Sequence, residues 1–274
     1  MKAGPECKEC LRLLMRQVME LSTSDPKVRS GIRKEISRIL EGFSAEIIPP
    51  DLSNEFHRAA KALSKNPDPF RERKLEELER ARKVFSKIEH KGDLRSCVEI
   101  AAQGNAIDFF VDPKILDREL SVKPNFAIDD IPRLERKLGS AKDILYLADN
   151  AGEVFFDIPL LKFLEKKSRT WYVVKEAPVQ NDLSINDIRR ASIDIPVRIL
   201  TAPGVVGFYP GLASPELRKK FERADLVVAK GMGHYETLTE LSESKRFFFI
   251  VRAKCAPVAR SLGVSVGDYV AMLR

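Results

Sequence analysis

Two polar residues follow directly after an apolar run in the middle of the chain. Asp149 ends the run DILYLAD (143–149), and Asn150 comes next, before a helical stretch that begins near Gly152 and Glu153. A helix start attracts anions, whereas carboxylate and amide oxygens attract hard cations. A dinucleotide-binding or methyl-donor fold would show a glycine-rich turn here, and this loop has a single glycine. Two interpretations remain open: a cation site, or ordinary caps of the next helix.

A third oxygen ligand follows the next apolar run, TWYVVK (170–175). Asn181 and Asp182 come just before another helical stretch. If the two runs are neighbouring strands, Asp182 can join Asp149 and Asn150. Two carboxylates and an amide oxygen form a hard set that suits Mg²⁺ or Mn²⁺ better than zinc. The alternative is again an ordinary helix cap.

Basic residues follow three other apolar runs. Lys175 and Lys230 end their runs, and Lys254 follows the run RFFFIVR (246–252). In an open parallel sheet, ligands bind at the carboxyl ends of the strands. Oxygen ligands and lysines would therefore gather at one edge, which is the composition of a metal and phosphate site.

The segment AKGMGHYETL (229–238) adds two glycines to this pattern. Gly231 and Gly233 flank a tight turn after a predicted strand and would let backbone N–H groups approach a phosphate closely. Such turns are common, so the signal is weak by itself. His234 is interpreted as a turn or wall residue rather than a ligand.

A C-x-x-C motif near the start of the chain carries separate chemistry. Cys7 and Cys10 could form half of a zinc site or a redox pair, but no second C-x-x-C follows. Four cysteines in a chain of 274 residues do not make a disulfide framework, so reduced thiols are expected.

Two kinds of element must position these residues. Up to about Gly104 the apolar spacing is helical, which predicts an all-helical domain over residues 1–104. After Ser140, short apolar runs alternate with helical stretches, which predicts a largely parallel sheet covered on both faces. The expected fold is α/β, with a Rossmann-like three-layer domain over residues 105–274. The predicted strands are 143–149, 170–175, 196–200, 225–230 and 246–252, with a last one near Val264 to Met272.

Composition excludes several classes of protein. No run approaches the roughly 18 apolar residues of a membrane span and the start has no signal core, so a cytoplasmic protein is expected. The net charge is +7, but Lys and Arg alternate with Asp and Glu along most of the chain, as in RERKLEELERARK (71–83), and this pattern is typical of a solvated helix face. We therefore expect no nucleic-acid partner. His57 and His90 are expected at the surface, and the abundance of Lys, Glu and Arg hints at a thermophilic source.

These motifs together resemble the metal-dependent damage-control phosphatases, a family once described as acidic-residue methyltransferase-like. The resemblance covers nearly the whole chain and is most specific in DNAGE followed by KGxGxxE. The matching segments are the C-x-x-C motif, DPFRERK (68–74), GNAIDF (104–109), DNAGE (149–153), ND (181–182), KGMGHYE (230–236) and RAKCAPVA (252–259).

The resemblance implies roles for individual residues. Asp149, Asn150 and Asp182 would hold the divalent cation, and Lys230 and Lys254 would lie near the phosphate. Asn105 and Asp108 match a motif near the site. Apart from the resemblance, the helix start at Gly152 and the turn at Gly231 would offer backbone N–H groups to the substrate. The family has an asparagine where this chain has His234, so any polar contact from that position is open.

The residues and the resemblance together predict hydrolysis of phosphomonoesters of small metabolites with Mg²⁺, Mn²⁺, Co²⁺ or Ni²⁺. Sugar phosphates are the substrates that the resemblance implies. Asp149 and Lys254 would be catalytic, and Glu153 would be the base or orient the attacking water. One alternative is a carboxyl methyltransferase that uses S-adenosylmethionine, against which the missing glycine-rich turn argues. The other is a non-catalytic metabolite-binding protein that uses its helical half as a partner surface.

Overall fold

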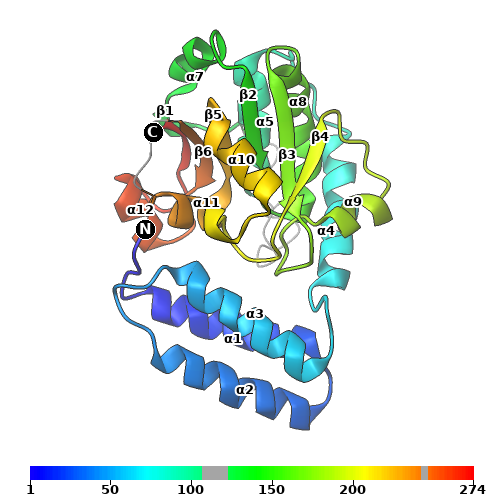
Figure 1. Ribbon diagram of the computed structural model, residues 1–274, viewed down its shortest axis with the longest axis vertical. Helices are drawn as coiled ribbons and strands as arrows, with labels where there is room; N and C mark the ends of the chain where they lie inside the picture. Colours follow the sequence, from blue (N-terminus) through cyan, green and yellow to red (C-terminus); the bar gives the residue numbers. More distant parts are fainter. Residues whose placement is uncertain (107–122, 242–245) are drawn as a thin grey trace.

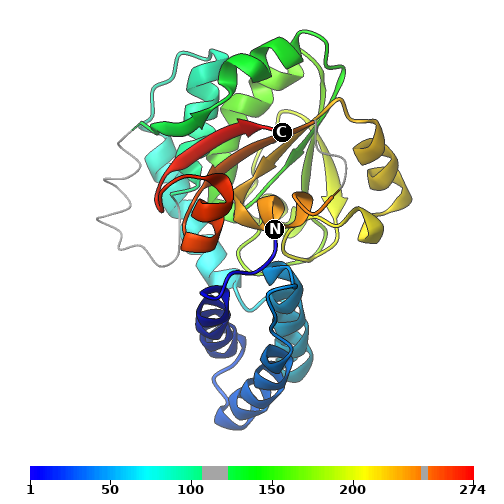
Figure 2. The ribbon, with the colours of Figure 1, turned by 90° about the vertical axis from the view of Figure 1, so that its left-hand side faces the viewer.

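Three N-terminal helices form a unit with its own core. The computed structural model describes residues 1–106, 123–241 and 246–274, and this helical unit comprises α1 (Cys7–Ser22), α2 (Pro26–Glu41) and α3 (Pro49–Ser64). Asp25 is the N-cap of α2, because its carboxylate accepts a hydrogen bond of 2.8 Å from the backbone N–H of Lys27. Ile32, Ile36 and Phe56 are fully buried between the helices. Figures 1 and 2 show the unit projecting below the sheet.

Two further helices leave this unit and pack against the sheet. The apolar residues of α4 (Arg71–Phe85) and α5 (Leu94–Gly104) belong to the same core as one face of the sheet. The expectation of helices alone before residue 105 is confirmed. Where the domain boundary lies stays a prediction.

The second half of the chain forms a seven-stranded sheet in the order β1-β7-β6-β5-β2-β3-β4. Strands β2 to β6 are parallel, whereas β7 runs antiparallel to β6 and pairs parallel with the edge strand β1. The strands are β1 (Phe126–Asp129), β2 (Asp143–Leu147), β3 (Arg169–Lys175), β4 (Arg198–Ala202), β5 (Leu226–Lys230), β6 (Phe247–Arg252) and β7 (Tyr269–Leu273).

Helices cover both faces of this sheet, which confirms the expected three-layer α/β fold. Alternate strand residues such as Tyr146 and Leu147 point into opposite cores. One core also contains apolar side chains of α4, α5, α7 (Ile131–Leu138), α8 (Val154–Glu165) and α9 (Ile185–Arg190). The other takes α10 (Pro215–Arg223), α11 (Gly231–Leu238) and α12 (Ala256–Leu262). No described helix has the length and apolar character needed to cross a membrane.

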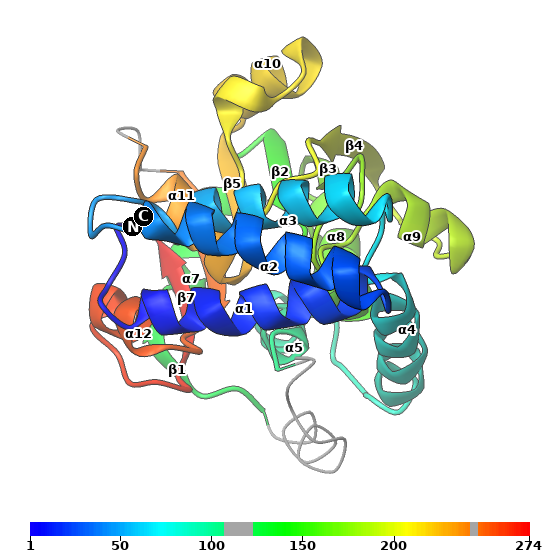
Figure 3. The ribbon, with the colours of Figure 1, turned by 90° about the horizontal axis from the view of Figure 1, so that it is seen from below.

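The helical unit covers the edge of the sheet at which the parallel strands end. Figure 3, seen from below, shows α1, α2 and α3 in front of the strands. The side-chain amide of Asn54 on α3 makes two hydrogen bonds with the backbone of Val206, which follows β4. The hydroxyl of Tyr209 donates to the Asp51 carboxylate at 2.6 Å. Helix α3 also reaches the loop after β3, which carries Asp182, because the Lys61 ammonium donates to the Pro178 carbonyl.

Three features differ from the sequence expectations. The short strand β1 was not predicted, because its residues are only partly buried and its apolar run is brief. The charged helix α4 is not a solvated face throughout, since Lys74 and Glu77 are buried. His57 is buried rather than at the surface, and the centroid of its ring lies 5.6 Å from that of Phe70 in an edge-to-face arrangement. His90 is exposed, as expected.

Candidate metal and phosphate site

Backbone pairing brings the three predicted oxygen ligands together. Strand β2 ends at Leu147, and the loop that follows runs beside the loop after β3. Asn150 and Asp182 form an antiparallel bridge. The Leu183 N–H donates to the Asp149 carbonyl at 2.8 Å, and the Ala151 N–H donates to the Asn181 carbonyl at 2.8 Å. The carboxyl ends of two adjacent strands are thus joined at the point where their polar residues lie.

Hydrogen bonds fix the orientation of the Asn150 side chain. Its Nδ2 donates to Asp149 Oδ2 at 3.2 Å and to Glu153 Oε1 at 2.8 Å. An ionised carboxylate can only accept a hydrogen bond, so in this arrangement the amide nitrogen faces the two carboxylates. The Asn150 carbonyl oxygen is therefore turned away from both carboxylates. Because Glu153 lies on the short 3₁₀ turn η1 (Ala151–Glu153), the start of the helical segment sets this orientation.

Gly231 leaves room for the Asp149 carboxylate. It begins α11 with φ +78°, a conformation that side chains other than hydrogen disfavour. A Cβ atom at this position would lie 1.9 Å from Asp149 Oδ2. The glycine is thus required by a close approach of the backbone to the carboxylate. The sequence indicated that a glycine is needed here for close approach of a ligand, and the structure adds the close approach of the Asp149 carboxylate as a second reason for a glycine at this position.

The charges at this edge of the sheet are only partly balanced. Burial, followed by the negative charges of Glu153 and Asp182, raises the pKa of Asp149 well above its ordinary value. Burial also raises the pKa of Asp182, although Lys175 acts in the opposite direction. The Lys175 ammonium lies 3.5 Å from Asp182 Oδ2 and donates to the Gly207 carbonyl at 2.7 Å. Further positive charge near Asp149 would favour its ionised form.

Beneath these residues lies a buried charge network. The Lys230 ammonium, whose side chain has no exposed surface, contacts Glu153 Oε2 at 2.5 Å and Asp157 Oδ1 at 3.0 Å. Tyr146 and Tyr172 donate their hydroxyls to Asp157 at 2.6 and 2.8 Å. Burial disfavours the Lys230 cation, but Asp157 and Glu153 outweigh it and raise the pKa of the ammonium. Every charged member of this network has a partner of opposite charge.

Two other predicted positions lie near the site in different settings. Lys254, after β6, is partly exposed and within electrostatic reach of Asp149. His234 is buried, and burial followed by the charge of Lys175 lowers its pKa to about 3. Its Nδ1 contacts the Lys230 carbonyl at 2.8 Å, and a carbonyl can only accept, so Nδ1 carries the proton. His234 is therefore neutral, with Nε2 unprotonated, and its position in the wall of the site stays a prediction.

The remaining predicted residues are less completely defined. Asn105 follows α5 and is buried, and its Nδ2 lacks a hydrogen-bond partner among the described residues. Gly152 is buried within η1, and Asp108 lies outside the described residues. Cys7 is buried and Cys10 exposed at the start of α1, and neither forms a disulfide bond. Their role stays open.

The donor set fits a hard divalent cation. In the described parts of the chain, no three His, Cys, Asp or Glu side chains are arranged to hold a metal ion. A cation at this edge would therefore need the amide oxygen of Asn150 besides Asp149 and Asp182. That oxygen is turned away from the neighbouring carboxylates. The pKa of Asp149 is raised by burial and then by the like charges of Glu153 and Asp182, which a cation would offset.

Sequence reasoning missed several residues around this set. Lys175 was noted at a strand end without a role, although it lies beside Asp182. Asp157, Tyr146 and Tyr172 gave no sequence signal, because buried helix and strand positions usually serve packing alone. A cavity of about 470 Å³ lies elsewhere, at the amino edge of the sheet between Lys142 and Arg198, and none of its lining residues belongs to the predicted site.

Comparisons with known proteins agree with the sequence resemblance. Residues 4–270 match the family described as the damage-control phosphatase ARMT1-like domain. A damage-control phosphatase of Pyrococcus horikoshii is 34% identical over 99% of this chain and 98% of its own. One of Archaeoglobus fulgidus is 35% identical over 99% of both chains. A crystal structure of a DUF89 family protein from Pyrococcus horikoshii superposes with a TM-score of 0.89, at 32% identity, over 100% of this chain and 99% of that one. Because match and coverage extend from end to end, the chain belongs to the damage-control phosphatase ARMT1-like domain family.

Proposed function

We propose that this chain is a divalent-metal-dependent phosphatase that hydrolyses phosphomonoesters of small metabolites. One observation carries the proposal: the Asn150 amide is held with its N–H groups on Asp149 and Glu153, which leaves its carbonyl oxygen for a cation. The names of two relatives support phosphatase chemistry. Sugar phosphates and damaged phosphorylated metabolites are the substrate classes that we would test first.

The metal ligands in this proposal are Asp149, Asn150 and Asp182. Their oxygens suit Mn²⁺ or Mg²⁺, with Co²⁺ and Ni²⁺ as further candidates. A bound divalent cation supplies Lewis-acid polarisation of the phosphoryl group and a water of lowered pKa. The chain itself holds the ligands in place through the paired loops after β2 and β3.

Lysines offset the charge of the transferring group. Lys254 is partly exposed near Asp149, so its ammonium can contact the phosphoryl oxygens. Lys230 has no exposed surface and is satisfied by Glu153 and Asp157. We therefore assign Lys230 an indirect role, through Glu153 and the orientation of Asn150. In that arrangement Glu153 orients a ligand, and a role as general base would require it to leave Lys230.

The proposed substrate contacts come from residues on several elements. The Nδ2 of the buried Asn105, which has no hydrogen-bond partner among the residues that the structure describes, suits a donor to a substrate oxygen. Gly152 lies in η1 and Gly231 begins α11, and N–H groups at the start of a helix attract anions. Asp108 is a further candidate by its motif alone.

The test is hydrolysis of p-nitrophenyl phosphate and a sugar-phosphate panel by chelator-stripped protein. Mg²⁺, Mn²⁺, Co²⁺ and Ni²⁺ are added back separately. We expect activity to return with metal in wild type and to fall by at least about a hundredfold in Asp149→Ala. Asp143→Ala, at the opposite end of the same strand, is the matched control and should keep its activity.

Two outcomes would favour the other classes of function. Wild-type activity that persists without metal, or in Asp149→Ala, would contradict the proposed site. Absence of hydrolysis together with calorimetric binding of S-adenosylmethionine would favour a carboxyl methyltransferase. Binding of a phosphorylated metabolite without turnover under any metal would favour a binding protein.

A further inference from the structure

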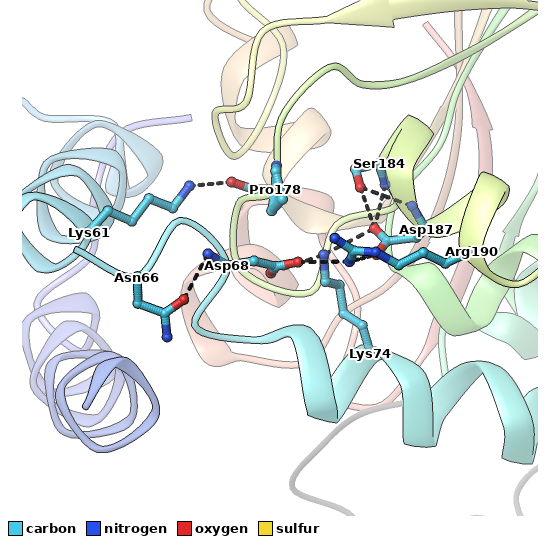
Figure 4. Close-up of polar contacts among 8 residues, drawn as sticks. All are labelled: Lys61, Asn66, Asp68, Lys74, Pro178, Ser184, Asp187 and Arg190. Atoms are coloured by element: carbon cyan, nitrogen blue, oxygen red, sulfur yellow. Dashed lines mark hydrogen bonds and ion pairs between the residues drawn. The ribbon is translucent and has the colours of Figure 1, made fainter. Parts of the chain in front are cut away.

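A fully buried lysine on α4 lies between two acidic residues from different parts of the chain. The Lys74 ammonium is 3.0 Å from Asp187 Oδ2 and 3.2 Å from Asp68 Oδ1, and its side chain has no exposed surface. Arg190 contacts Asp68 from the other side at 3.5 Å. Figure 4 shows these side chains converging between the start of α4 and the helix α9. Two positive and two negative charges thus balance.

The same cluster fixes the start of α9. Asp187 Oδ2, which receives the Lys74 ammonium, also accepts hydrogen bonds from Ser184 N–H at 2.9 Å and Ser184 Oγ at 2.5 Å. Ser184 Oγ in turn accepts from the Asp187 N–H at 3.3 Å, which completes a capping box. Lys74 therefore holds Asp187, and Asp187 holds the backbone of Ser184.

Ser184 is two residues after the proposed metal ligand Asp182. It forms a bridge with Lys175, the last residue of β3. At the other end of this loop, the Lys61 ammonium on α3 donates to the Pro178 carbonyl, as Figure 4 also shows. The loop that carries Asp182 is thus held at both ends by helices from the N-terminal part of the chain.

We propose that Lys74 is a positioning residue for the metal site: through Asp187 and Ser184 it holds the loop that presents Asp182. This role rests on the proposed function, because it assumes that Asp182 binds the cation. Lys74 itself touches neither the cation nor the substrate. Partners that orient metal ligands in this way commonly change metal affinity by 10-fold to 100-fold when they are removed.

The sign of the effect separates positioning from simple electrostatics. The charge of Lys74 acts on Asp182 across the cluster. If that charge were its whole contribution, removing a cation from beside a cation site would strengthen metal binding. A positioning role predicts the opposite, because a displaced Asp182 is a poorer ligand. The two explanations therefore differ in direction.

The experiment measures Mn²⁺ binding by electron paramagnetic resonance and calorimetry, without reference to turnover. We expect Lys74→Met to raise the Mn²⁺ Kd by about 10-fold to 100-fold relative to wild type. Lys83→Met on the same helix removes a lysine that is 72% exposed and should leave the Kd unchanged. Ser184→Ala breaks the capping box without changing any charge and should weaken binding toward the lower end of that range.

The outcomes distinguish this inference from the proposed function. Wild-type protein that binds no Mn²⁺ would overturn both. If wild type binds Mn²⁺ but Lys74→Met binds it equally well or more tightly, the positioning role is wrong while the metal site stands. Should Lys74→Met fail to fold, Ser184→Ala decides: an unchanged Kd overturns the role, and a weakened one supports it.

Discussion

At the scale of single residues, the candidate site depends on the absence of one side chain. Gly231 combines φ +78° with a position where a Cβ would meet Asp149 Oδ2 at 1.9 Å. We expect Gly231→Ala to displace the Asp149 carboxylate and to reduce both Mn²⁺ affinity and phosphatase activity by at least about a hundredfold. Calorimetry with Mn²⁺ and assays of p-nitrophenyl phosphate hydrolysis measure the two effects.

Gly263 provides the matched control for that substitution. It also has a left-handed backbone, with φ +72°, but nothing lies within 4 Å of its Cβ position. Gly263→Ala should therefore show the cost of backbone strain, about 1 kcal/mol of unfolding free energy, without loss of metal affinity. If both variants lost metal equally, the close approach to Asp149 would not be the cause.

His57 gives the free energy of unfolding a predictable dependence on pH. Burial, and then the charge of Lys61, lowers its pKa to about 4 from an ordinary value of 6.5. Between these pH values the folded protein binds fewer protons at His57 than the unfolded chain, so stability rises with pH and falls as pH is lowered. The loss from pH 6.5 to 4 is up to roughly 3 kcal/mol.

Chemical denaturation at several pH values measures this dependence. His57→Leu should show a smaller decline in unfolding free energy between pH 6.5 and 4 than wild type does. The exposed His90 is the control, and His90→Leu should keep the wild-type decline. Equal declines in wild type and His57→Leu would mean that His57 is not buried in its neutral form.

At the scale of elements, the Lys230 network joins three strands to one helix. It takes Tyr146 from β2, Tyr172 from β3, Lys230 from β5 and Asp157 from α8. We expect Lys230→Met to lower the free energy of unfolding by about 3–5 kcal/mol, because Asp157 and Glu153 would stay buried without a cation. Urea denaturation measures this change.

The same variant tests the indirect role proposed for Lys230. The exposed pair of Lys83 and Glu79 is the comparison, and Lys83→Met should show no measurable change in stability. A Lys230→Met protein of wild-type stability but greatly raised KM would instead indicate direct contact between Lys230 and the phosphate.

Much of the sheet could be predicted because buried parallel strands have a simple pattern. The runs that became β2, β3, β5 and β6 are almost continuously apolar and are followed by or end in polar residues, as expected of strands covered on both faces. The meeting of Asp149 with Asp182 followed from the same rule, since adjacent parallel strands end at one edge. Strand β1, a partly exposed edge of four residues, lacked that pattern.

The buried charges could not be predicted because their partners are distant in sequence. Lys74 lies in a segment of alternating charges that is typical of a solvated helix. One of its two partners, Asp68, is close in sequence, but the other, Asp187, is more than a hundred residues further along the chain. Lys230 was expected to face the phosphate because it ends a strand, and only the tertiary structure shows Glu153 and Asp157 around it. Local pattern indicates a charge, whereas burial depends on what packs over it.

At the scale of the whole molecule, the helical unit is packed internally by apolar side chains but contacts the loops of the sheet through polar groups. Ile32, Ile36 and Phe56 lie in its own core. The contacts with the loops after β3 and β4 include the Asn54 amide and the Lys61 ammonium. Polar contacts at such a boundary stabilise less than a continuous apolar core, so the unit can open as one cooperative segment.

Native-state hydrogen exchange can detect this segment. We expect the amides of α1, α2 and α3 to exchange through an opening of lower free energy than those of β2 and β5. Asn54→Ala removes hydrogen bonds of 2.7 and 3.2 Å to Val206 and should lower that opening free energy by about 1–3 kcal/mol, while protection of β2 and β5 stays unchanged. Ser37→Ala, at an exposed position on α2, is the control and should change neither. If Asn54→Ala lowered protection of the helices and the strands to the same extent, the helical unit and the sheet would unfold together, and the polar boundary would not separate two levels of stability.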